Sequence, residues 1–134
     1  MIKCETVGMI EVCKVNPVLK SDKDVVNNSF ITVDEEVYLV SNVINGDDSY
    51  REDVVIKAGE FLNGFYLKAW ENQKLFIDGK HITGGVDAAP VGTVLVPAED
   101  GTLVPGEATG VHLVVTDANL RLTEKAVKAK IVVA

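Results

Sequence analysis

The chain has 134 residues, a net charge of −7 and a charged fraction of 25%. This length predicts one domain with its own core, and the acidic balance argues against a nucleic-acid partner, which needs a basic face. The longest apolar runs are far shorter than the ~18 residues that would span a bilayer, so no membrane partner is expected. Met1–Glu5 lacks the charged-then-apolar pattern of a secretion signal, which predicts synthesis in a cytoplasm.

Residues 1–15 are expected to form a docking arm or an edge strand. Charged residues alternate here with six apolar ones, which are the candidate contact residues for a partner: Met1, Ile2, Val7, Met9, Ile10 and Val12. An edge strand of this kind can add to the sheet of a neighbouring protein, where main-chain hydrogen bonds supply affinity. Pairing within its own domain is the alternative, because a terminus is ordered only when something holds it.

The next part of the chain predicts a hairpin. Phe30–Val33 and Val37–Ile44 are rich in strand-forming residues and flank Asp34–Glu36, and the second run alternates with a period of two. Before it, Asn27–Ser29 matches a glycosylation acceptor but is interpreted as a plain turn. After it, the short apolar run Val54–Ile56 is typical of a buried strand.

Phe65–Trp70 alternates apolar and other residues with the period of a half-buried strand. Three aromatic side chains in one strand more often combine core packing with one interface anchor. Tyr66 and Trp70 are therefore the candidate interface aromatics. The alternative is a sugar-binding platform formed by Phe65, Tyr66 and Trp70.

The second half of the chain predicts further strands. Asp78-Gly79, between the β-rich runs Leu75–Ile77 and Lys80–Thr83, is a strong hairpin signal, and Gly84–Pro90 is expected to be a flexible loop. The strands expected after this loop are Thr93–Val96, Leu103–Pro105, Val111–Thr116 and Val127–Val133, the last with Lys128 and Lys130 on its opposite face.

Helix signals are confined to two possible turns, at 117–122 and 123–126, and no segment repeats apolar residues at helical spacing. Many short strands separated by turns predict an all-β chain with one or two short helical turns. The expected architecture is a small barrel or sandwich over residues 1–134, as a single β-rich domain.

No set of residues forms a recognisable reactive centre. His81 and His112 have no evident acid–base partner, and Cys4 and Cys13 lack the spacing of a zinc site. The acidic run 47–53 lacks the central glycine and the final glutamate of a calcium loop. We therefore expect no catalytic residue, no metal, no cofactor and no enzymatic activity.

Two stretches carry a resemblance, Val55–Gly64 and Val91–Gly101, the latter together with Val111–Thr116 and Asn119-Leu120. They resemble the small head-decoration proteins of tailed bacteriophages, the lambda-D-like type, although residues 1–53 form a longer N-terminal region than the shortest members have. The resemblance implies a non-enzymatic virion protein on the outer capsid surface. It also implies that the protein bridges neighbouring major capsid subunits and forms a homo-oligomer, with a trimer expected.

A second hypothesis from another class is a carbohydrate- or receptor-binding β module of a virion or cell surface. The two hypotheses differ in how many copies a particle would carry. A decoration protein would be spread over the head, whereas a receptor-binding module would belong to a single appendage.

Overall fold

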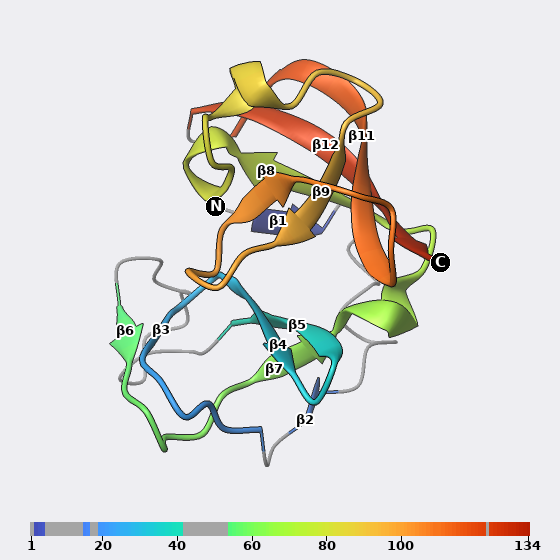
Figure 1. Cartoon of the computed structure of the whole chain (residues 1–134). Helices are drawn as coiled ribbons and strands as arrows, with labels where there is room; N and C mark the ends of the chain where they lie inside the picture. Colours follow the sequence, from blue (N-terminus) through green and yellow to red (C-terminus); the bar gives the residue numbers. More distant parts are fainter. Residues whose placement is uncertain (1, 5–14, 17–18, 42–53, 123) are drawn as a thin grey trace.

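The computed structural model describes residues 2–4, 15–16, 19–41, 54–122 and 124–134, and within them the fold is all-β, as predicted (Figure 1). Three sheets are present in this part of the chain, and none of them closes into a barrel, so the sandwich alternative is the one that fits. The strands are β1 (Ile2–Cys4), β2 (Val15–Asn16), β3 (Val25–Val26), β4 (Phe30–Val33), β5 (Glu36–Val40), β6 (Val55–Ile56), β7 (Gly64–Tyr66), β8 (Lys74–Asp78), β9 (Val94–Pro97), β10 (Leu103–Pro105), β11 (Val111–Arg121) and β12 (Lys125–Val133). Three short 3-10 helices are η1 (Leu67–Trp70), η2 (Gly79–His81) and η3 (Val86–Ala88).

The six-stranded sheet has the order β1-β8-β12-β11-β9-β10 and is built around the long antiparallel pair β11 and β12. Its register follows the predicted alternation in β12, because Val127, Ala129 and Ile131 are fully buried. Lys128 and Lys130 alternate with them and therefore lie on the outer face. Four strands predicted in the second half of the chain are confirmed as β9, β10, β11 and β12, although β11 extends beyond the predicted Thr116 and β12 begins before the predicted Val127.

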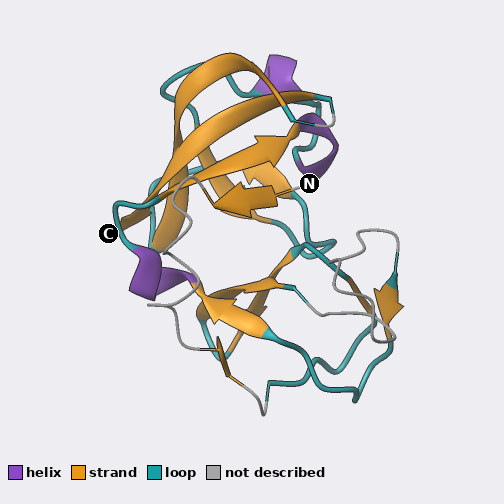
Figure 2. Ribbon diagram, turned by 180° about the vertical axis from the view of Figure 1, so that it is seen from behind, coloured by secondary structure: helices purple, strands orange, loops and turns teal. Residues whose placement is uncertain are grey.

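The four-stranded sheet has the order β2-β7-β5-β4 and contains the predicted hairpin of β4 and β5. The hairpin turns at Asp34 and Glu35, whose φ angles are 51° and 68°. Phe30, Leu39 and Phe65 lie side by side across three strands and point into a core that the six-stranded sheet covers from the other side. Figure 2 shows these two sheets stacked one above the other.

The opposite face of the four-stranded sheet covers a second, smaller core. Ile31 and Val40 pack there against residues contributed by the neighbouring loops and by the two-stranded sheet of β3 and β6, namely Leu19, Val25, Ile56 and Leu62. The four-stranded sheet is therefore a middle layer with a core on each side. The run Val54–Ile56, which the sequence predicts to be a buried strand, contains β6. Ile56 is buried there, whereas Val55 is 45% exposed.

The prediction of a hairpin at Asp78-Gly79 is wrong. β8 pairs with β12 and β1 instead, and the chain continues into η2 before Ile82 forms a parallel bridge with Leu103. Gly79 is not among the residues with a positive φ, which a two-residue hairpin turn of this type requires. It is packed so closely that an added Cβ would lie 3.1 Å from Val86 and 3.3 Å from the carbonyl oxygen of Lys125.

Two further expectations are corrected. The strand expected over Phe65–Trp70 ends at Tyr66 and is followed by η1, in which Leu67 and Trp70 are both buried. Residues three apart eclipse in a 3-10 helix, so this geometry sends both side chains into the same core. The helical turn expected at 117–122 is instead the end of β11, which is irregular where Asn119 has a φ of 60°.

The remaining corrections are smaller. The loop expected at Gly84–Pro90 contains η3, and in the segment 123–126 β12 already begins at Lys125, with Thr123 outside the described residues. No helix in the described part of the chain is long and apolar enough to cross a bilayer.

Candidate functional site

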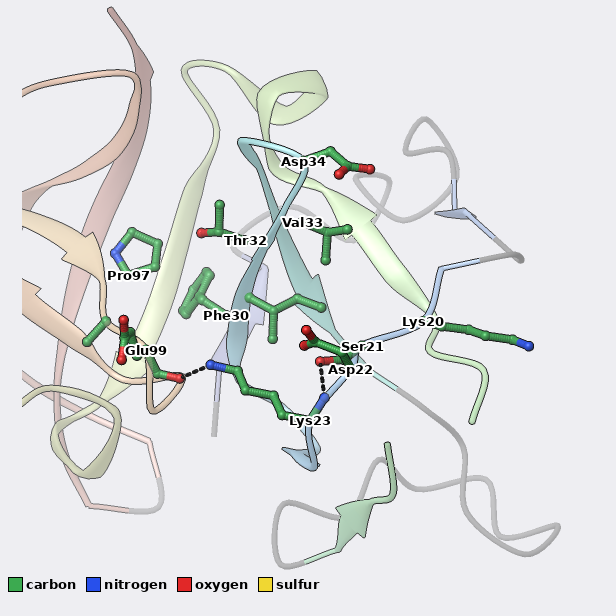
Figure 3. A pocket seen from close by; sticks show the side chains of 12 residues that line it. Lys20, Ser21, Asp22, Lys23, Phe30, Thr32, Val33, Asp34, Pro97 and Glu99 are labelled. Carbon is green, nitrogen blue, oxygen red and sulfur yellow. Dashed lines mark hydrogen bonds between the residues drawn. The ribbon is translucent and has the colours of Figure 1, made fainter. Parts of the chain in front are cut away.

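A cleft of about 520 Å³ lies beside β4, between the loop at 20–23 and the turn that follows β9 (Figure 3). The buried side chains of Phe30 and Ile31 form its apolar wall. Across its mouth, Lys23 Nζ donates a hydrogen bond of 2.8 Å to the carbonyl oxygen of Glu99. Lys20 points away from the other lining residues, and its ammonium group lies 4.4 Å from the ring centroid of Phe61.

The loop at 20–23 is held by hydrogen bonds beside this cleft. Ser21 is the lining hydroxyl next to Lys23, and its Oγ accepts a hydrogen bond of 3.2 Å from the Lys23 backbone N–H. The Lys23 bridge ties the loop at 20–23 to the turn that follows β9, and so to the six-stranded sheet.

A second hollow of about 290 Å³ is lined by residues 26–29 and 100–102 together with Lys80 and His81. Its carboxylate, Asp100, accepts hydrogen bonds from the Thr102 hydroxyl at 2.6 Å and from the Thr102 backbone N–H at 3.0 Å. These bonds lower the pKa of Asp100. A carboxylate with a lowered pKa is a weaker general base at neutral pH than one with an ordinary pKa.

The floor of this second hollow is a polar seam between the two large sheets. Asn28 has a φ of 63°, and its side-chain oxygen accepts a hydrogen bond of 2.9 Å from the backbone N–H of Ile2. Phe30 N–H donates to the carbonyl of Gly101 at 3.1 Å. Asn27, the acceptor position of the glycosylation motif, is 1% exposed and lies in the bend between β3 and β4.

Of the N-terminal contact candidates, only Ile2 lies within the described residues; Met1, Val7, Met9, Ile10 and Val12 lie outside them. Ile2 is 8% exposed, belongs to the main core and pairs with Ile77 of β8. β1 is therefore an edge strand of its own sheet. The side chain of Ile2 is held within the domain and is not available to a partner.

The two aromatic candidates differ in position. Trp70 is 1% exposed and stacks on Phe65 with 5.4 Å between ring centroids, so its assignment to an interface is corrected to a core position. The indole Nε1 of Trp70 has no hydrogen-bond partner among the described residues. It lies in the core because the turn of η1 directs it inward together with Leu67.

Tyr66 is half-buried on the other face of the middle sheet. Its hydroxyl donates a hydrogen bond of 2.9 Å to Glu36 Oε2, and its ring lies 5.6 Å from that of Tyr38. The hydrogen bond to Glu36, with smaller contributions from desolvation and from the negative charge, raises the pKa of Tyr66. Sequence reasoning missed Tyr38 and Glu36; cross-strand neighbours become visible only when the register of β5 against β7 is known.

Exposed apolar side chains mark a different surface. Among the described residues, four large apolar side chains are exposed: Val26, Val55, Phe61 and Val91. Val26 and Val55 face each other across the β3–β6 pair, with 44% and 45% of their surface exposed. Phe61 is 61% exposed, and sequence reasoning did not single it out.

Metal-ligating groups do not gather in the described part of the chain, where no three histidine, cysteine, aspartate or glutamate side chains lie together. His112 is 4% exposed, with Nδ1 placed 3.0 Å from the carbonyl oxygen of Gly110. Cys13 lies outside the described residues. No protein-family model, no curated protein and no solved structure matches the chain.

Proposed function

We propose that the chain is a virion structural protein that decorates and stabilises the outer surface of a phage capsid by bridging neighbouring major capsid subunits. In this role it has no enzymatic activity and binds no cofactor, nucleic acid or membrane. It is synthesised in the host cytoplasm and acts on the outer capsid surface. Its partners are the major capsid protein and further copies of itself, with a trimer as the expected oligomer.

The observation that carries this proposal is the position of the exposed apolar side chains. Val55 and Phe61 lie in the first stretch that resembles the head-decoration proteins, and Val91 lies in the second. Scattered exposed apolar residues are common on soluble proteins, but here three of the four described ones fall in the two stretches that carry the resemblance. Burying them against a capsid would contribute roughly 25 cal/mol per Å² before ordering costs.

The proposal is tested by binding to expanded capsids that lack decoration proteins. We expect the wild-type chain to co-sediment with them and to appear in micrographs as knobs spread over the head. The variant Phe61→Ser should lower occupancy while leaving the melting temperature unchanged, because Phe61 is already exposed. Glu60→Ser, a change at an exposed polar neighbour, is the matched control.

If Phe61→Ser and wild type occupy the capsid equally, Phe61 is not part of the contact with the capsid. Wild-type protein that stays in the supernatant at every capsid concentration would reject the decoration function. Labelling of a single appendage instead of the head would favour a receptor-binding role.

The pair Tyr38 and Tyr66 supports the second candidate function, a carbohydrate- or receptor-binding β module. Two half-exposed phenol rings beside the Glu36 carboxylate combine an apolar surface with hydrogen-bonding groups, as a sugar requires. A glycan array probed with wild type and with Tyr38→Ala tests this reading. Binding that Tyr38→Ala abolishes would favour it, and no signal on any glycan would reject it.

A further inference from the structure

The outer face of the six-stranded sheet combines apolar side chains with lysines. Alternation places a row of half-buried side chains on this face of β8, β12, β11 and β9, and we call six of them the lysine face: Lys74, Phe76, Lys128, Lys130, Val114 and Val94. All six remain accessible, so no described segment covers this face completely. A sheet face of this composition differs from the strongly polar face that a solvated sheet usually presents.

Lys74 and Lys130 are the unusual pair on this face. They are direct cross-strand partners in β8 and β12, where like charges destabilise a sheet. Neither forms an ion pair or a hydrogen bond through its side chain with any described residue. Lys128, in contrast, has Asp117 at 3.9 Å and the ring of Phe76 at 5.2 Å.

The chain carries the complementary charge on another element. The turn of the β4–β5 hairpin presents Asp34, Glu35 and Glu36 in succession, and the first two are exposed. Neither Asp34 nor Glu35 forms an ion pair with a described residue of the same copy. Val37, which follows this acidic turn, is buried in the main core, and Val33, which precedes the turn, packs against the second core, so the turn offers its charges more than an apolar surface.

We propose that the lysine face binds the acidic β4–β5 turn of a second copy of this chain. Carboxylates of one copy then neutralise Lys74 and Lys130 of the next, which removes the cross-strand repulsion. A long polyanion such as nucleic acid is a poorer occupant, because the net charge of −7 repels it at long range.

The contact joins two different surfaces, so it is head-to-tail. A dimer made this way leaves one lysine face and one acidic turn unoccupied, and further copies add until a ring closes. The inference deepens the homo-oligomer of the proposed function. It is measured without capsids, so its failure leaves the capsid-binding result with Phe61→Ser untouched.

Sedimentation velocity over a range of protein concentrations tests the contact. We expect wild type to form assemblies larger than a dimer, and the association to weaken as salt is added. The double variant Lys74→Glu, Lys130→Glu should weaken self-association by about tenfold or more, because it places carboxylates opposite carboxylates. Lys125→Glu, an exposed lysine on the same strand but outside the lysine face, is the control and should associate like wild type.

A charge exchange provides the decisive experiment. Asp34→Lys, Glu35→Lys alone should also lose self-association. Its mixture with Lys74→Glu, Lys130→Glu should form mixed assemblies in which the two variants alternate, joined in turn by the reversed pair and by the wild-type pair. Circular dichroism and thermal melting confirm that each variant is folded.

Three outcomes would overturn the contact. These are a wild type that is monomeric at all concentrations, a Lys74→Glu, Lys130→Glu variant that associates like wild type, or folded single-surface variants whose mixture does not associate.

Discussion

At the scale of single residues, the hydrogen bond between Tyr66 and Glu36 links the charge state of the protein to its structure. The phenol donates to the carboxylate only while it is protonated, which is why the pKa of Tyr66 is raised. A group with a raised folded-state pKa contributes stability that is fully present below its unfolded value, about 10 for tyrosine. That contribution is lost as the pH rises through the folded pKa.

We therefore predict that Glu36→Gln lowers the pKa of Tyr66 towards its ordinary value. The measurement is an ultraviolet titration of tyrosinate in a background in which Tyr38 and Tyr50, the other tyrosines of the chain, are phenylalanine. Asp34→Asn removes a carboxylate two residues from Glu36 along the chain without touching the hydrogen bond, and is the control. A titration midpoint that does not move in Glu36→Gln would show that the bond is absent in solution.

At the scale of elements, the seam between the two large sheets depends on one close backbone approach. Gly101 has a φ of 88°, and a Cβ added there would lie 2.9 Å from the Cβ of Ser29. Gly92 has a similar φ of 94° but open space around it. A substitution at either glycine therefore places a side chain on a left-handed backbone. Only a substitution at Gly101 also brings that side chain against Ser29.

We predict that Gly92→Ala lowers the free energy of unfolding by about 1–2 kcal/mol, the cost of the left-handed conformation. Gly101→Ala should lower it by a further ~1–3 kcal/mol through overpacking against Ser29. Urea denaturation of both variants measures the difference. If both variants lose the same free energy of unfolding, the turn between β9 and β10 moves away from Ser29 without cost.

The turn of the β4–β5 hairpin also contains left-handed residues, but these are not glycines, so its sequence is not optimised for stability. Asp34 and Glu35 both have a positive φ, where asparagine and glycine are preferred. We predict that Asp34→Asn, Glu35→Gly raises the free energy of unfolding by about 0.5–1 kcal/mol in thermal melts. It should also weaken the proposed self-association, a combination that a purely structural role for the turn would not produce.

At the scale of the whole molecule, the described residues are held together by apolar packing and backbone hydrogen bonds. The main core joins both large sheets, whereas the ion pairs Lys57–Asp24 and Lys128–Asp117 lie at the surface. Surface pairs of this kind contribute little to stability. The fold should therefore respond weakly to salt, in contrast to the proposed self-association.

We predict that EDTA leaves the melting temperature unchanged, because no group of potential metal ligands gathers in the described part of the chain. Differential scanning calorimetry with and without the chelator measures this, and magnesium-saturated EDTA is the control for ionic strength. A decrease of several degrees would indicate a structural metal, since metal binding contributes directly to folding.

The sequence predicts those parts of the fold in which each strand has one buried face. In β12, the alternation of Val127, Ala129 and Ile131 with lysines is enough to assign both faces. The prediction from sequence fails at Asp78-Gly79, because pairing with β12, a strand more than 40 residues away, overrides the local turn signal. The lysine face was out of reach for the same reason, because nothing in the sequence places Lys74 beside Lys130.

The middle layer has a consequence for how the molecule comes apart. Phe30 and Leu39 are buried in one core, while Ile31 and Val40, their neighbours along the same strands, are buried in the other. The two cores therefore share a wall, and losing either one would expose apolar side chains of β4 and β5 to water. Neither core can unfold and leave the other intact at low cost. The two cores should therefore unfold together, in one cooperative transition.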